Sequence, residues 1–337
     1  MDTLTHFAIG ACVGEIIGGK SIGKRALFVG GLLQLIPDID VLFSVTLDPA
    51  SNVLAHRGFT HSFLFVSLIT PLLAWSFTRW SRGSPQPFYF WLRFIGVQIL
   101  LHVILDSCNA YGTGWFEPFS HHRVSFHTLF VADPFFSIPV GLSCLALFLM
   151  TLKNNRRVAI AVCGLLLSGC YLGYSLTNKF LVDRAVQRAL VRQSIPYSKY
   201  ITTPTPFNNL LWFVATTGTS GSYVGYRSVF DREADISFEF FPRNDSLLPL
   251  AADKEEVAKL VRFSQEFYTL NWKADTLVFN DLRFGQMLGW QNSRAEFAFH
   301  YYLSPRLDNK LVIQRGRFAN WDRAGLNALL TRIGGEK

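Results

Sequence analysis

The sequence predicts an α-helical polytopic membrane domain of four to six helices, six being preferred, followed by a small soluble α+β domain. Half of the 337 residues are hydrophobic and only 17% are charged, a low charged fraction for a soluble protein. The charges are also unevenly spread, because residues 62–78 and 158–177 contain no Asp, Glu, Lys or Arg. Runs of this length can cross a bilayer core, which needs about 20 mainly apolar residues. After about residue 180 the sequence has the mixed pattern of a soluble domain.

Six apolar segments precede that point, with approximate bounds 4–18, 26–47, 62–78, 88–105, 133–152 and 158–177. The first segment is short and places Gly10, Gly14 and Gly18 on one helix face, where small residues permit close helix packing. The second is interrupted by the sequence PDID, whose proline can break a helix. All five cysteines fall in the apolar part without a CxxC pair, so we expect buried small side chains rather than disulfides or zinc thiolates.

The loops between these segments predict an orientation. Most of the basic residues in these loops follow the first, third and fifth segments: Lys20, Lys24, Arg25, Arg79, Arg82, Lys153, Arg156 and Arg157. The intervening loops, 48–61 and 107–132, hold only Arg57 and Arg123. The positive-inside rule therefore places the first set in the cytoplasm. With six spans, the N-terminus and the C-terminal region then lie outside, in the periplasm of a bacterium whose inner membrane the protein crosses several times.

The chain accordingly divides into three parts. Residues 1–178 form the transmembrane domain, 179–194 an amphipathic connecting helix, and 195–337 an extracytoplasmic α+β domain. Alternating apolar patterns predict strands within the last part, at 208–218, 222–231, 236–242, 276–285, 295–303 and 310–316. Helical spacing predicts helices at 253–270 and 320–333.

Ionisable residues at the ends of the apolar segments predict a metal site. Such residues are costly at membrane depth and are functional candidates by default. The predicted topology places all of them on the outer face, and the candidate ligands are His6, Asp38, Asp40, His56, His61, His102 and Asp106. Imidazole nitrogens and carboxylate oxygens suit one or two divalent ions, zinc being preferred over manganese or iron.

This cluster suggests hydrolytic chemistry. A bound metal turns water into a nucleophile near neutral pH, and Asp40 or Asp106 could serve as the general base. Arg57 could hold an anionic group, although an ordinary loop charge is an equally good interpretation. Each pattern also has a plain structural interpretation, PDID for example being a turn with capping aspartates. Secondary candidates are Asp2, Asn109 and Asp133, whereas His121, His122 and His127 are expected to be solvated and His300 structural.

Five motifs in a fixed order resemble those of one bacterial family. They are MDTLTH, PDID, HRGFTHS, HVILDSCNAYGT and FVADPFF, within about residues 1 to 136. The sequence is similar to the inner-membrane metal-dependent hydrolases of the YdjM/YbcI type, some of them LexA-regulated, and its C-terminal half resembles an extended form of that family. The resemblance implies metal-dependent hydrolysis, with the seven candidate ligands as the matching positions.

We therefore expect a membrane-bound metal-dependent hydrolase with its site at the outer face of the inner membrane. The favoured substrate is a phosphoester or pyrophosphate of a lipid-linked molecule, so the lipid bilayer and such a lipid are the expected partners. Two alternatives are open: hydrolysis of ester or amide bonds, and a stress-related membrane protein in which the metal is structural. Nucleic-acid binding is not expected, because the basic residues occupy short loops without a nucleic-acid-binding motif.

Overall fold

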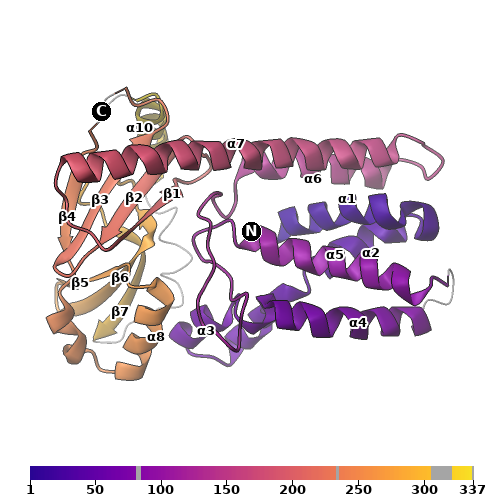
Figure 1. Ribbon diagram of the computed structural model, residues 1–337, viewed down its shortest axis with the longest axis horizontal. Coiled ribbons are helices and arrows are strands. Elements are labelled where there is room, and N and C mark those ends of the chain that lie inside the picture. Colours follow the sequence, from indigo (N-terminus) through magenta and orange to yellow (C-terminus); the bar gives the residue numbers. More distant parts are fainter. Residues whose placement is uncertain (81–84, 233–234, 305–320, 336–337) are drawn as a thin grey trace. The chain divides into compact units, whose positions relative to one another are not determined.

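The computed structural model describes residues 1–80, 85–232, 235–304 and 321–335 (Figure 1). It divides into two compact units. The first comprises residues 1–45 and 55–174 and is helical, and the second comprises residues 46–54 together with the chain from 175 onward. A helical membrane region followed by antiparallel sheets confirms the predicted fold class.

Among the described residues, three helices are long and apolar enough to cross a membrane: α4 (Phe63–Trp80), α5 (Phe88–Asp106) and α7 (Arg157–Arg192). The helices α1 (Thr3–Ile22), α2 (Arg25–Leu33) and α6 (Pro134–Leu149) complete the helical unit. Three helices thus meet the criterion of length and hydropathy for a membrane span, whereas the sequence favoured six spans. Helix α1 carries Glu15 and Lys20, and α6 has only 16 residues.

The second predicted segment is not one helix. Helix α2 has nine residues and is followed by a 3₁₀ helix, η1 (Pro37–Val45). The change starts before the proline, where Leu35 N bonds to Leu32 O and Ile36 N to Leu33 O instead of the carbonyls four residues back. Pro37 lacks an N–H group and cannot continue an α-helical hydrogen-bond series. The short helix α3 (Pro49–Ala55) and the 3₁₀ turn η2 (Phe59–His61) then lead into α4.

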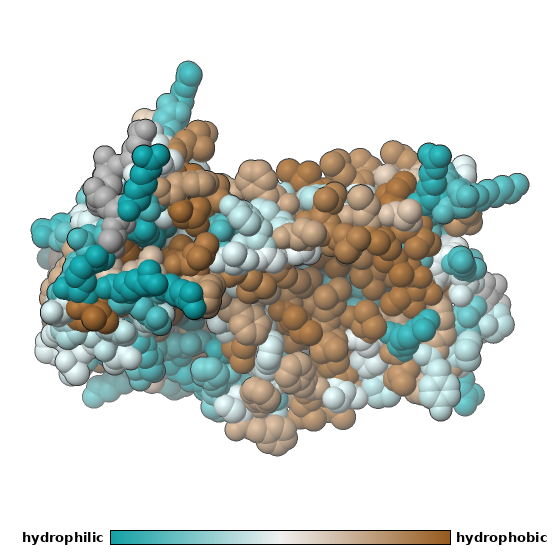
Figure 2. Space-filling view, turned by 45° about the horizontal axis from the view of Figure 1, so that its top comes forward, coloured by the Kyte–Doolittle hydropathy of each residue, from teal (hydrophilic) through white to brown (hydrophobic). Residues whose placement is uncertain are grey.

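Unlike a soluble protein, the helical unit exposes many large apolar side chains on its surface. Leu72, Leu142 and Leu166 are each more than half exposed on α4, α6 and α7. Figure 2 shows apolar side chains spread over this unit on the face in view. Inside it, Glu15 and Arg157 form a buried ion pair at 2.6 Å. Large exposed apolar surfaces of this kind are suited to contact with lipid.

The cysteines only partly follow the expectation. Cys12, Cys108 and Cys144 are buried, but Cys163 and Cys170 are exposed. Both exposed cysteines lie on α7, where an apolar side chain can face lipid instead of the protein interior.

The last apolar segment, 158–177, and the predicted connecting helix, 179–194, lie largely on one helix. Helix α7 runs without interruption through 36 residues, and no proline occurs in it. Its later part belongs to the second unit, where Val182, Val186 and Leu190 pack with Trp212.

The second unit contains two antiparallel sheets. The first has the order β1 (Lys199–Pro204), β2 (Leu211–Thr217), β3 (Gly221–Ser228), β4 (Phe238–Pro242). The other has the order β5 (Tyr268–Lys273), β6 (Thr276–Gln286), β7 (Phe297–Ser304). A 3₁₀ turn, η3 (Asp245–Leu250), and the helices α8 (Lys254–Ser264) and α10 (Arg323–Ile333) complete the unit.

One strand of this unit was missed, and one prediction about it was wrong. Strand β1 was not predicted. The segment 253–270, predicted as one helix, ends as a helix at Ser264 and becomes strand β5 at Tyr268. The cause is local, because Gln265 and Glu266 adopt the left-handed backbone conformation, with φ of 52° and 72°. The predicted strand at 310–316 lies outside the described residues.

The predicted small-residue face of α1 packs closely against α2. A Cβ atom added at Gly14 would lie 2.2 Å from the carbonyl oxygen of Ala26, and one at Gly10 would lie 2.4 Å from that of Gly30. Both distances are far below van der Waals contact, so α1 and α2 can approach this closely only without side chains at these positions.

We expect Gly14→Ala to lower the thermal stability of the detergent-solubilised protein, because overpacking of this kind costs about 1–3 kcal/mol. Gly141→Ala on α6 is the matched control, since a Cβ atom there meets nothing within 4 Å. Melting temperatures of both variants, measured by the loss of soluble protein on heating, test the packing. Equal values for the two would contradict it.

Candidate metal centre

The ionisable residues predicted from the sequence gather at one end of the helical unit. His6 lies near the start of α1, and His102 and Asp106 lie one turn apart near the end of α5. Asp38 and Asp40 come from η1, which follows α2, and His61 comes from η2, which precedes α4. Because successive helices run in opposite directions, the start of one and the end of the next meet at the same level.

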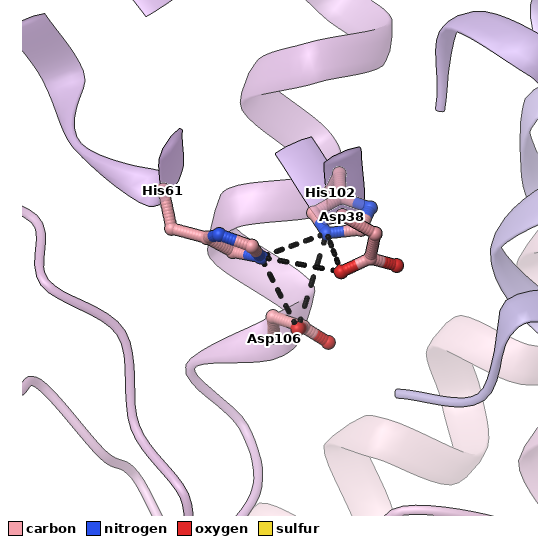
Figure 3. A group of neighbouring side chains, drawn as sticks. All are labelled: Asp38, His61, His102 and Asp106. Atoms are coloured by element: carbon pink, nitrogen blue, oxygen red, sulfur yellow. Dashed lines mark hydrogen bonds and ion pairs between the residues drawn. The ribbon is translucent and has the colours of Figure 1, made fainter. Parts of the chain in front are cut away.

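Four of these side chains, Asp38, His61, His102 and Asp106, point toward one another (Figure 3). The two Nε2 atoms of His61 and His102 are 3.1 Å apart. Each of them lies 3.5 Å from Asp38 Oδ1. Asp106 Oδ2 lies 3.6 Å from the first and 3.9 Å from the second.

These distances fit a common metal ion. Ligand atoms about 2.0–2.2 Å from one tetrahedral zinc ion lie about 3.3–3.6 Å from each other. The observed separations of 3.1–3.9 Å bracket that range. The donor set of two imidazole nitrogens and two carboxylate oxygens is also one that divalent transition metals prefer.

A second group shares one carboxylate with the first. Asp38, Asp40 and His56 also offer atoms within 4.8 Å of one another. Asp38 therefore lies where a carboxylate could bridge two ions. Burial alone would raise the pKa of Asp38, but the neighbouring imidazole groups of His102 and His61 outweigh burial and lower the pKa. The carboxylate is thus ionised at neutral pH, as a metal ligand must be.

Asp40 organises the loop that carries His56 and His61. Its Oδ2 atom accepts hydrogen bonds from the backbone N–H of Arg57 and from Thr60 Oγ1, both at 2.8 Å. Its Oδ1 atom lies 2.9 Å from His56 Nδ1. Both carboxylate oxygens of Asp40 therefore have partners in the protein.

Thr60 determines the tautomer of His61. The Thr60 hydroxyl donates its only hydrogen to Asp40, so at 3.1 Å from His61 Nδ1 it must accept the proton of that nitrogen. In the neutral imidazole, the Nε2 atom of His61 is then the unprotonated nitrogen, and it faces the cluster, as metal ligation requires. Sequence reasoning missed Thr60, although its position directly before His61 in HRGFTHS was a signal.

His6 lies beside the group of four. Its ring stacks on His102 at 3.9 Å, and its Nε2 atom lies 3.0 Å from Asp106 Oδ1. The N-terminal amino group of Met1 also contacts Asp106 Oδ1. These contacts occupy one oxygen of Asp106 and leave the other, Oδ2, directed at the histidines.

Arg57 is buried against the centre. Its Nε atom lies 2.9 Å from Asp106 Oδ2, and its Nη1 atom donates to Asn109 Oδ1 at 2.7 Å. The guanidinium group also lies 5.0 Å from the centroid of the Tyr111 ring. Asn109, a secondary candidate, is therefore a residue that positions Arg57.

The other candidates lie outside the cluster. Asp2 and Asp133 accept backbone hydrogen bonds at the starts of α1 and α6. His121 pairs with Glu117 and is exposed, as is His122. His127 is 9% exposed, so the prediction of a solvated side chain was wrong there.

A cavity of about 480 Å³ opens beside the centre. Its polar wall includes Asp38, His56 and Arg57. Its apolar wall comes from the end of α2 and from η1, and consists of Leu32, Leu35, Ile36, Ile39, Val41 and Leu42. One space is thus lined by candidate metal ligands and by aliphatic side chains.

Comparison with known proteins agrees with the family that the sequence motifs indicate. Residues 1–181 match the model of the YdjM inner membrane protein family. The chain belongs to this family. The resemblance drawn from the motifs is therefore confirmed, and the family name agrees with the membrane-spanning helices of the structure.

Two relatives are similar in sequence to this chain. The inner membrane protein YbcI of Escherichia coli (strain K12) is 38% identical over 122 residues, which are 36% of this chain and 69% of YbcI. The uncharacterized protein YfhP of Bacillus subtilis (strain 168) is 28% identical over 290 residues, 82% of this chain and 83% of YfhP. No solved structure matches.

We expect the purified protein to contain one or two equivalents of a divalent transition metal, and the variant with both Asp38→Ala and His61→Ala to contain almost none. His121→Ala, an exposed histidine outside the cluster, is the matched control. Elemental mass spectrometry of metal-replete preparations measures all three. A metal-free wild type, or equal loss in the control, would refute the metal centre.

We expect Thr60→Val to weaken metal binding by about 10–100-fold, the usual cost of losing a group that orients a ligand. Thr60→Ser keeps the hydroxyl and should bind as the wild type does. Competition with a chelator of known affinity measures the difference. If the valine variant binds as tightly as the serine variant, the hydroxyl does not control His61.

Proposed function

We propose that this protein is a metal-dependent hydrolase that cleaves a phosphoester or pyrophosphate bond of a lipid or lipid-linked substrate at the outer face of the inner membrane. The observation that carries the proposal is the shared cavity, in which candidate ligands line one wall and aliphatic side chains the other. A substrate that fills both parts has an apolar chain and a polar headgroup.

The headgroup would lie at the polar wall. Asp38, His61, His102 and Asp106 would hold the ion, and the second group could hold another. A bound divalent ion supplies a nucleophile from water near neutral pH and polarises the bond to be cleaved. Arg57 lines the same wall and carries a permanent positive charge, which favours an anionic headgroup.

Proton transfer would fall to the pair of His56 and Asp40 rather than to Asp106. Asp106 is surrounded by Arg57, His6 and the histidines of the cluster, so it is better suited to ligation. Asp40 is paired with His56, which is about one-third exposed and lines the cavity. With a single ion bound, His56 Nε2 would be the atom that takes the proton, and Asp40 would support it from behind. With two ions bound, His56 would be a ligand instead.

The outer location rests on the distribution of charge within the helical unit. Lys20, Lys24 and Arg25 lie where α1 ends and α2 begins, and Arg79 lies at the end of α4. The metal cluster lies at the opposite ends of these helices. The positive-inside rule then places the cluster on the outer face, and the proposed periplasmic location of the C-terminal unit follows from the same rule.

The test is release of inorganic phosphate from phosphorylated lipids. Metal-loaded protein in lipid nanodiscs should release phosphate from phosphatidic acid or a polyprenyl pyrophosphate, and Asp38→Asn should not. Arg57→Gln should lower kcat by about 10²–10³, as loss of one charge-stabilising group usually does. The matched Arg57→Lys variant should retain more activity, since it keeps the positive charge.

Leu35→Trp separates lipid from soluble substrates. Narrowing the apolar wall should slow cleavage of long-chain lipids and leave cleavage of a short-chain phosphate ester unchanged. If fully metal-loaded protein releases phosphate from no phosphorylated lipid but cleaves a neutral ester, the substrate class proposed here is wrong. If it cleaves neither, the enzymatic proposal fails.

A further inference from the structure

The segment between α5 and α6, residues 107–133, is an irregular loop at the end of the helical unit that carries the metal cluster (Figure 1). It begins directly after Asp106, a residue of the cluster. Three of its phenylalanines are exposed, Phe116 by 51%, Phe119 by 83% and Phe126 by 42%. Exposure of such large apolar side chains to water is unfavourable, and a group of them indicates a surface that has a partner.

These rings belong to one stretch, residues 115–126, which we call the aromatic loop. Both of its ends are fixed to the residue that follows α5. Trp115 Nε1 donates to Ser107 Oγ at 2.7 Å, and the backbone N–H of Phe126 donates to Ser107 O at 2.7 Å. The exposure of the rings is therefore a consequence of how the loop is folded and held.

Ring contacts connect the aromatic loop to a membrane-spanning helix. Phe63, the first residue of α4, has its ring centroid 5.0 Å from that of Trp115 and 6.0 Å from that of Phe116. Its backbone N–H also donates to Trp115 O at 2.9 Å. Phe59, just before α4, is 46% exposed and contacts the ring of Phe65. The exposed rings are thus continuous with the apolar and largely exposed surface of α4, at the level where that helix begins.

The charged side chains of the aromatic loop are Glu117 and Arg123, and both have partners. Glu117 pairs with His121 at 2.8 Å. Arg123 is only 7% exposed and donates through Nη2 to His56 O at 2.8 Å. The exposed imidazoles of His121 and His122 are polar, but such groups are accommodated among lipid headgroups. A loop with bulky rings outside and paired charges suits the interface between headgroups and hydrocarbon, where aromatic side chains are enriched.

We propose that the aromatic loop lies in the headgroup region of the bilayer and inserts Phe116 and Phe119 between lipid molecules. The partner is the lipid surface itself, at the membrane face that carries the metal cluster. The backbone N–H of Gly114 donates to Arg57 O at 2.8 Å, so the loop is attached to the segment that contains Arg57 and the ligand His61. Insertion of the rings would hold the cluster at the depth of the headgroups. This membrane contact does not depend on metal binding or hydrolysis.

The test places a fluorophore at position 119 of the full chain in nanodiscs of phosphatidylethanolamine and phosphatidylglycerol. Phe119→Cys, made with Cys163→Ala and Cys170→Ala to remove the two exposed cysteines, is labelled with a nitrobenzoxadiazole reagent. We expect stronger quenching by a lipid nitroxide near the headgroup than by one near the end of the acyl chain, and little quenching by aqueous iodide. Phe230→Cys, at an exposed phenylalanine of the C-terminal unit, is the matched control and should show strong quenching by iodide and little by lipid.

Two further sites make the result decisive. Leu72→Cys, in the middle of α4, should be quenched most by the deep nitroxide, and Phe116→Cys should behave as Phe119→Cys does. The proposal is overturned if the labels at 116 and 119 are as accessible to iodide as the label at 230. Protection from both iodide and lipid would overturn it as well, because the rings would then be covered by protein, such as a second copy of this chain. Both loop variants should keep the melting temperature of the wild type, since the replaced side chains are exposed.

Discussion

The helical unit depends on how one buried carboxylate is neutralised. Asp106 closes a membrane-spanning helix and is inaccessible to solvent, where an unpaired charge would be strongly destabilising. Arg57, His6, His61 and His102 surround it, and each comes from a different part of the chain or a different turn of the helix. Satisfying this one charge therefore draws α1, the loop before α4 and the end of α5 to one place, and the site forms where they meet.

A second layer of polar contacts gives the cluster its geometry. Asp40 bonds to Arg57 N, Thr60 and His56, which holds the loop 56–61 in one conformation. Arg57 adopts a left-handed backbone with φ of 62°, a conformation that this loop maintains for a residue other than glycine. The close contact of α1 with α2 brings His6 near the start of η1. The ligands are thus positioned by backbone and hydroxyl groups as well as by one another.

The polar groups of the two units have different surroundings. In the helical unit, buried charges meet beside an aliphatic wall, an arrangement suited to a cation and an amphipathic substrate. In the C-terminal unit, the ion pairs Lys273–Glu296 and Arg294–Glu239 lie at the surface, and one face of the sheet β5–β6–β7 carries the polar side chains of Thr269, Asn280 and His300.

The sequence by itself determined the membrane character, the α+β character of the C-terminal part, the family and the residues of the candidate cluster. These depend on local composition and on short motifs, so residues such as His102 and Asp106 can be paired by helical spacing alone. Only the tertiary structure decided that α2 is short, that α7 continues past residue 178 and that Tyr268 begins a strand. The role of Thr60, the position of His6 beside the four-residue group and the lining of the cavity were likewise decided there. Each of these depends on contacts between residues distant in sequence, whose energies local pattern does not contain.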